Sequence, residues 1–199
     1  MPVRRARFFL RWSQFILFTA AGAALAYCVC VPAEAWLYRR RATLEFRRLL
    51  HQEGRLKPPA RPAEAPAAED GFIGFIEIPR LGVSAVLAEG TGDGTLRKAV
   101  GHIAGTPLPG EAGNVGIAGH RDTFFRPLRN IRSNDIVVLV TLRGRYRYRV
   151  VSTKVVAPDA VGVLAPSSGE TLTLVTCYPF YFVGPAPERF IIRAERVGG

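Results

Sequence analysis

Three side chains suited to nucleophilic chemistry each lie at the end of a predicted strand: Cys177, His120 and Arg189. A thiol with a reference pKa of about 8.5 is mostly protonated at neutral pH, so a nucleophilic cysteine needs a base or a cation close to it. A histidine can be that base. An arginine can stabilise the oxyanion that forms when a thiolate attacks a carbonyl. The three residue types therefore suggest attack on an acyl group, provided that the fold brings them together.

The cysteine follows a clear strand pattern. Residues 171–176 alternate β-branched and aliphatic side chains, and Pro179, which cannot donate to a ladder, ends the strand near Cys177. A thiol at a strand end can be open to substrate. The alternative is a small buried hydrophobic side chain, because free cysteine is among the most buried residue types. Cys28 and Cys30 lie in a distant apolar run, so the sequence contains neither a disulfide framework nor a zinc-ligand spacing.

His120 is the best placed of the three histidines. It directly follows a predicted strand, as Cys177 does, and two strand ends can meet at one rim of a barrel. Arg189 begins the last predicted strand, which its apolar neighbours pin into the core. His51 lies among arginines near the N-terminal apolar run and is expected to be solvated. His102 lies in a turn-rich stretch and is expected to be structural.

The part of the chain from residue 71 to residue 199 carries many short strand patterns. They cover residues 72–78, 83–87, 114–118, 135–142, 146–156, 171–177 and 189–197. One helical turn is expected at 95–99 and a short helix at 124–131. Many short strands separated by turns predict an all-β fold, a closed or nearly closed barrel with short helices.

The N-terminal part predicts a membrane helix. Residues 1–14 carry four arginines, and residues 15–31 contain no charge. This apolar run spans roughly 26 Å as a helix, close to a hydrocarbon core of about 30 Å, and Trp36 and Tyr38 extend it as interfacial anchors. We therefore expect a basic segment over 1–14 and a single transmembrane helix, a signal anchor, over 15–37.

A cleavable signal peptide is the alternative, because residues 33–35 place small side chains at the spacing that a signal peptidase reads. A lipoprotein signal fits less well, since Tyr27 stands before Cys28 where a small residue is expected. Residues 38–70 predict a juxtamembrane helix followed by a Pro/Ala-rich linker, so the folded domain is expected over 71–199.

The charge of the chain favours a membrane partner over nucleic acid. Lys and Arg outnumber Asp and Glu by 27 to 16, which gives a net charge of +11. Near the N-terminus these arginines flank the apolar run on both sides, which is typical of a membrane edge but gives no orientation. In residues 143–149 four arginines share one strand face, which we interpret as a solvated outer face; contact with an anionic lipid or polymer is the alternative.

Four stretches resemble the sortases, the membrane-anchored cysteine transpeptidases. Thr173-Leu-Val-Thr-Cys177 resembles the TLxTC signature of that family. The others are GHIAGTPLPG at 101–110, NVGIAGHRDTFF at 114–125 and PERF at 187–190. The likeness covers essentially all of residues 71–199, with histidine, cysteine and arginine in the family's order. The wording HRDTFF and CYPF is most similar to class D.

This resemblance implies an eight-stranded sortase-type barrel and a role for each of the three side chains. Cys177 would attack the Thr–Gly-type bond of an LPxTG-like sorting signal on a secreted protein and hold the substrate as a thioester. His120 would be general acid and then base, and Arg189 would steady the oxyanion. The acceptor would be an amine on the cell surface, from a cell-wall precursor or a pilin lysine. Anchoring surface proteins requires residues 71–199 outside the cytoplasm, on a single-pass protein of the cell membrane.

The resemblance also implies where the peptide binds. In sortases the loop before the cysteine strand forms one wall of the groove, and Val161, Val163 and Leu164 there suit a hydrophobic pocket or are simply core. Thr176 either offers its hydroxyl to the peptide or is an ordinary strand residue. The loop has no acidic cluster that suggests a calcium site, so we expect neither a metal nor a cofactor.

Two other functions use the same residues. A peptide hydrolase would employ the same three side chains with water as the acceptor. A non-catalytic, membrane-tethered barrel would bind peptides or cell wall, although the intact trio argues against it. Papain-like and cell-wall peptidases place cysteine before histidine, the reverse of this chain, and L,D-transpeptidases want an arginine soon after the cysteine, where this chain has Tyr178-Pro-Phe-Tyr.

Overall fold

A computed structural model describes residues 12, 14, 16–23, 25–26, 71–182 and 184–198. The chain divides into two compact units, Met1–Arg40 and Arg41–Gly199. In the first unit the described residues are helical and exposed. Among the described residues, no helix has the length and apolar character needed to span a membrane. The predicted segments 1–14 and 15–37 fall only in part on described residues, and the predicted helix and linker at 38–70 lie outside them.

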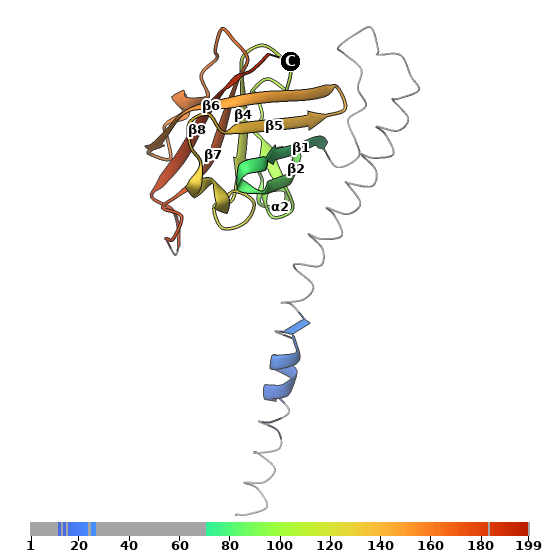
Figure 1. Ribbon diagram of the computed structural model, residues 1–199. Coiled ribbons are helices and arrows are strands. Elements are labelled where there is room, and N and C mark those ends of the chain that lie inside the picture. Colours follow the sequence, from blue (N-terminus) through green and yellow to red (C-terminus); the bar gives the residue numbers. More distant parts are fainter. Residues whose placement is uncertain are drawn as a thin grey trace, which may run out of the picture. The chain divides into compact units, whose positions relative to one another are not determined.

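The second unit contains a closed barrel (Figure 1). Around the barrel the order is β1-β2-β3-β4-β7-β8-β6-β5, with β5 pairing back onto β1. The strands are β1 (Phe72–Ile78), β2 (Val83–Glu89), β3 (Val100–His102), β4 (Asn114–Gly119), β5 (Ile136–Thr141), β6 (Gly144–Val156), β7 (Thr171–Tyr178) and β8 (Glu188–Arg196). The pairs β2/β3 and β4/β7 are parallel, and the other neighbours are antiparallel.

Four short helical segments join these strands within the described barrel. They are η1 (Pro79–Leu81), α2 (Asp93–Leu96), η2 (Arg126–Asn130) and η3 (Val161–Leu164), of which only α2 is an α-helix and the others are 3₁₀ helices. The predicted all-β barrel with short helices is thus confirmed. The strand pattern gave seven of the eight strands and missed β3, because three residues are too few to show an alternation.

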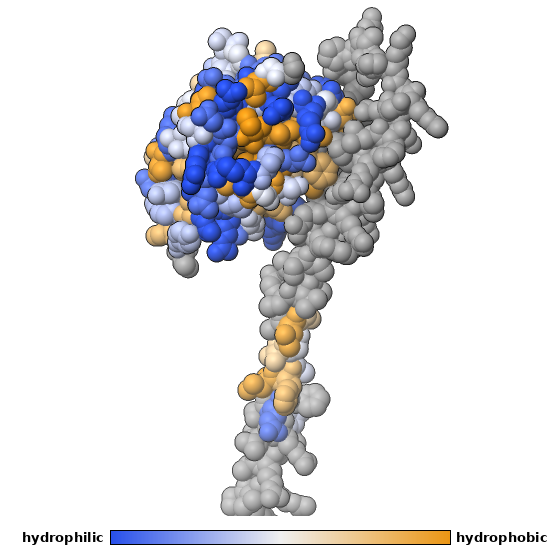
Figure 2. All heavy atoms as spheres, in the orientation of Figure 1, coloured by the Kyte–Doolittle hydropathy of each residue, from blue (hydrophilic) through white to orange (hydrophobic). Residues whose placement is uncertain are grey.

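Alternating side chains fill the barrel interior. The strand residues of the core cluster lie at alternate positions of their strands, and each of the eight strands contributes at least one. Large side chains that are fully buried include Ile76, Leu87, Ile117, Leu139, Tyr148, Leu174 and Ile192. Each of the aliphatic side chains among them contributes about 1.5–3 kcal/mol relative to an exposed one. Figure 2 shows the outer surface as a mixture of hydrophilic and hydrophobic residues, with a hydrophobic strip over β5 between hydrophilic neighbours.

His102 is structural, but it lies in a strand and not in a turn. It belongs to β3 and is only 3% exposed. Its Nδ1 lies 2.9 Å from a carboxylate oxygen of Glu89, and its Nε2 lies 3.0 Å from both Pro107 O and Thr106 Oγ1. These contacts hold the β3–β4 connection against β2 and leave His102 no part in the site described next.

Candidate active site

Strand register brings Cys177 and Arg189 together. β7 and β8 are antiparallel, and Cys177 pairs directly with Arg189 across the ladder. Directly paired Cβ atoms lie about 4.5–5.5 Å apart, so the two side chains start as neighbours. Both residues are half-buried. Nη1 of Arg189 donates to the carbonyl oxygens of Ala186 and Glu188, at 3.2 and 3.0 Å, which anchors the guanidinium at the start of its strand.

His120 reaches the same level from the other side of β7. β4 and β7 are parallel, and Gly119 pairs with Thr176, so His120 and Cys177 are the next residues on two neighbouring strands. The hydroxyl of Thr176 donates to the carbonyl oxygen of Gly119 at 2.7 Å, which ties the two strand ends together immediately before the pair. His120 is half-buried.

Side-chain alternation puts all three residues on the outer side of the barrel wall. Gly119 and Thr176 face the interior, so the residues that follow them, His120 and Cys177, face outward. Arg189, paired with Cys177, shares that face. Since β4, β7 and β8 are consecutive in the barrel (Figure 1), imidazole, thiol and guanidinium form one row across three strands. The structure therefore brings together the three predicted residues from distant parts of the sequence.

A close approach of backbone to ring fixes the end of β4. A Cβ at Gly119 would lie 2.6 Å from the ring of Phe125, which is fully buried. The chain turns back after His120, whose carbonyl oxygen accepts a hydrogen bond from the amide of Phe125 at 3.1 Å. Only glycine leaves room for this ring, and the packed ring holds the residue that precedes His120.

Three of the four predicted substrate-binding residues lie on η3, over the outer face of β4. Val161 is 77% exposed, whereas Val163 and Leu164 are half-buried. Leu164 packs on Gly116, where a Cβ would lie 3.0 Å from the Leu164 side chain. An apolar surface thus borders the same outer face that carries the row, as a groove wall requires.

Asn114, which the sequence reasoning missed, holds this wall in place. Its side chain is fully buried, and its Nδ2 donates to the carbonyl oxygens of Val163 and Ala165 at 3.1 and 3.2 Å. Its Oδ1 accepts a hydrogen bond of 2.7 Å from Thr173. A polar residue at the start of an otherwise apolar strand was the available signal.

Of the two roles considered for Thr176, a hydroxyl offered to the peptide or an ordinary strand residue, the structure favours the second. Its side chain is 2% exposed, and its hydroxyl proton is used on the carbonyl of Gly119. It therefore acts on the site by joining β4 to β7 and has no free hydroxyl for a peptide. Among the described residues no group of three or more His, Cys, Asp or Glu side chains is arranged to hold a metal ion.

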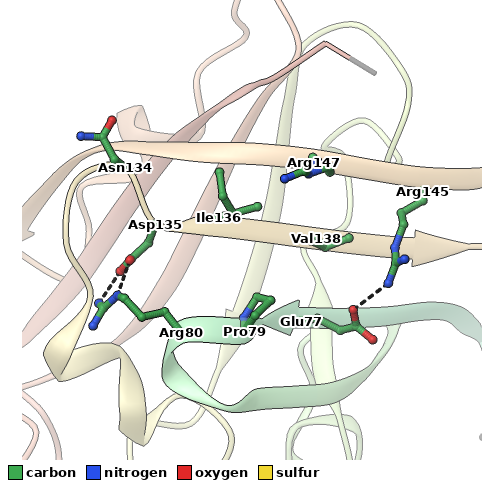
Figure 3. A pocket seen from close by; sticks show the side chains of 9 residues that line it. All are labelled: Glu77, Pro79, Arg80, Asn134, Asp135, Ile136, Val138, Arg145 and Arg147. Carbon is green, nitrogen blue, oxygen red and sulfur yellow. Dashed lines mark hydrogen bonds and ion pairs between the residues drawn. The ribbon is translucent and has the colours of Figure 1, made fainter.

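A separate cavity of about 590 Å³ lies on the outer face of β1, β5 and β6, and none of the row lines it. Figure 3 shows Arg145 pointing to Glu77 at one end of this cavity and Arg80 pointing to Asp135 at the other. The hydrogen bond from Arg80 to Asp135 holds the pKa of the Asp135 carboxyl below its ordinary range. These ion pairs agree with the interpretation of this face as a solvated outer surface.

In chemical terms, the row offers a nucleophile, a proton carrier and a fixed cation beside an apolar wall. The sortase-domain family model matches residues 76–197. Sortase D of Bacillus subtilis is 38% identical over 125 residues, which are 62% of this chain and 63% of that protein. This chain therefore spans less than two thirds of that relative's length.

Solved structures give the same result. A Sortase D5 transpeptidase of Clostridium perfringens is 32% identical, with a TM-score of 0.58 over 64% of this chain and 79% of that one. Sortase A of Corynebacterium diphtheriae is also 32% identical, with a TM-score of 0.61 over 66% of this chain and 63% of that one.

Proposed function

The chain belongs to the sortase family, and on that premise we propose that it is a cysteine transpeptidase, anchored in the cell membrane, that joins secreted proteins to an amine on the cell surface. The observation that carries the proposal is the row of His120, Cys177 and Arg189 on the outer face of β4, β7 and β8. The substrate is a sorting signal of the LPxTG type.

In the first step the thiolate of Cys177 attacks the carbonyl carbon of the Thr–Gly bond. The guanidinium of Arg189 stabilises the oxyanion, because a fixed cation beside developing charge needs no reorganisation. His120 then gives its proton to the leaving glycine amine, the C–N bond breaks, and the acyl group remains on sulfur as a thioester.

In the second step an amine attacks the thioester. His120 takes the proton from that amine, a new amide bond forms, and the thiolate of Cys177 leaves. The two half-reactions share one covalent intermediate, so ping-pong kinetics are expected. The apolar side chains of η3 accept the leucine and proline of the signal.

The test is to incubate the full chain, purified in detergent, with a library of sorting-signal peptides and to measure its intact mass. A peptide that fits adds its acyl mass to the protein, and Cys177→Ala abolishes the adduct. Arg189→Ala is expected to slow adduct formation by about 10²–10³-fold and His120→Ala by about 10²–10⁴-fold. No adduct with any peptide would refute the proposal, and release of free acid in the presence of amine would indicate a hydrolase.

Membrane anchoring is part of the proposal and rests on the uncharged run at 15–31 and its flanking arginines. With residues 1–14 in the cytoplasm, the barrel lies outside it. Protease added to spheroplasts should then degrade residues 71–199. If these residues are protected until the membrane is lysed, the orientation is the opposite of the one proposed.

A further inference from the structure

The residue after His120 holds the chain that follows Cys177. Nη1 of Arg121 donates to the carbonyl oxygen of Pro179 at 3.1 Å, and Nη2 donates to those of Phe182 and Gly184 at 2.7 and 2.9 Å. The same guanidinium lies over the ring of Phe182, 5.9 Å from its centroid. One side chain thus binds three carbonyl groups of the β7–β8 loop.

The loop has further contacts on both sides. Phe180 packs edge-on against Tyr178 and Phe190, with ring centroids 6.0 and 5.5 Å apart. Arg129, on η2, lies over the ring of Tyr181 at 5.5 Å. Tyr181 itself is 76% exposed, so the aromatic cluster secures the base of the loop, while the arginine contacts and a backbone hydrogen bond of 3.3 Å from Phe182 to Pro179 hold its described outer part.

The contacts of Arg121 join two segments that carry reactive side chains. Arg121 is bonded directly to His120, and Pro179 lies two residues after Cys177. The hydrogen bonds from Arg121 therefore close a short bridge between the segment that carries the imidazole and the segment that carries the thiol. Backbone hydrogen bonds pair β4 with β7 only up to Gly119 and Thr176, so beyond that point the bridge continues the connection.

We propose that Arg121 is a positioning residue, which keeps His120 and Cys177 in register by bridging the β4 end to the β7–β8 loop. The proposal rests on the function proposed above. It calls for arginine in particular, because the planar guanidinium presents several donors in a fixed fork, whereas a lysine ammonium is a point charge on a flexible stem.

The experiment compares Arg121→Gln and Arg121→Lys with the wild type, all as the full chain in detergent. Arg126→Gln is the matched control, because Arg126 is an exposed arginine of the same turn region and its side chain forms no hydrogen bond, ion pair or ring contact with the described part of the loop. Three quantities are measured: amide hydrogen exchange of residues 178–188, the thermal midpoint, and kcat and KM with a peptide that forms the thioester.

Loss of the bridge is expected to speed amide exchange in the loop and to lower kcat by about 10- to 100-fold, because small misplacements of reacting groups have effects of this size. KM should change by less than about threefold, since the donors of Arg121 are taken up by loop carbonyls and its role is to orient the reacting side chains. Arg121→Lys should recover only part of kcat, and Arg126→Gln should behave as wild type.

Two results would overturn the proposal. One is a loss confined to KM, which would make the loop only a wall for substrate. The other is an Arg121→Gln variant that keeps both its loop exchange rates and its kcat. Hydrogen exchange needs no substrate, so if no peptide is ever turned over, a loop that loosens in Arg121→Gln but not in Arg126→Gln still separates the bridge from a failure of the proposed function.

Discussion

At the scale of single residues, burial has a measurable effect on Tyr148. The side chain is fully buried in the barrel, and this burial raises its pKa to about 12, with a smaller contribution in the same direction from Glu170. An exposed tyrosine has a pKa of about 10, so between about pH 10 and 12 the unfolded chain releases a proton that the folded chain keeps.

Stability should therefore fall with alkaline pH through this residue. The contribution of Tyr148 is complete below about pH 10 and is lost as pH rises through 12, a change of about 3 kcal/mol for a difference of about two pKa units. Urea unfolding of wild type and Tyr148→Phe at several pH values should show the wild type losing stability faster above pH 10. The exposed Tyr181 gives the control, Tyr181→Phe, and parallel curves for wild type and Tyr148→Phe would contradict the expectation.

The three site residues also show what residue types can and cannot reveal. Cys177, His120 and Arg189 were recognisable as chemistry-bearing side chains at strand ends. Their alignment depends on the pairing of Gly119 with Thr176 and of Cys177 with Arg189, and register between distant strands has no local sequence signal. The family resemblance supplied the grouping that the residue pattern left open.

At the scale of elements, β4 organises the site from both of its ends. At its start Asn114 holds η3, and just beyond its end Arg121 holds the β7–β8 loop. Gly119 sets the direction in which the chain leaves the strand, because its missing Cβ makes room for Phe125.

Gly119→Ala should consequently damage both packing and activity. The added methyl group meets a ring that is fully buried, and overpacking of this kind costs about 1–3 kcal/mol. Because the strain falls next to His120, thioester formation should slow more than the loss of folded protein explains. Chemical denaturation and adduct kinetics measure the two effects. Gly94→Ala is the control, since nothing lies within 4 Å of a Cβ there; equal behaviour of the two variants would disprove this account.

Element prediction succeeded where a strand is long enough to alternate. β1, β5 and β7 follow the predicted ranges within one residue at each end, whereas β3 is a three-residue strand with a glycine at its centre. The predicted helix at 124–131 is the five-residue 3₁₀ helix η2, which ends where Ile131 adopts an extended backbone conformation. Such short elements are set by tertiary contacts more than by local propensity.

At the scale of the whole barrel, closure makes every strand depend on two neighbours. β1 pairs with β2 on one side and with β5 on the other, so it is the strand that closes the sheet. Without β1, strands β2 and β5 would each present an unpaired edge. The core would also lose the buried side chains of β1 and be exposed to water.

A chain that begins at residue 71 should unfold in one cooperative transition, whereas one that begins at residue 79 and so lacks β1 should not. Circular dichroism during urea unfolding measures this difference. Removal of residues 198–199, which lie beyond β8, is the control and should leave the transition unchanged. A cooperative transition in the chain without β1 would show that the barrel tolerates an open seam.

The outward direction of the reactive row has a consequence for how the protein can change. A substrate that binds on the outer face of a closed barrel does not compete with the core side chains for space. Each turnover can therefore proceed without a change in core packing. Substitutions in η3 and in the β7–β8 loop can then change substrate selectivity while the thermal stability of the barrel stays the same. Thermal stability and substrate selectivity can thus be engineered independently.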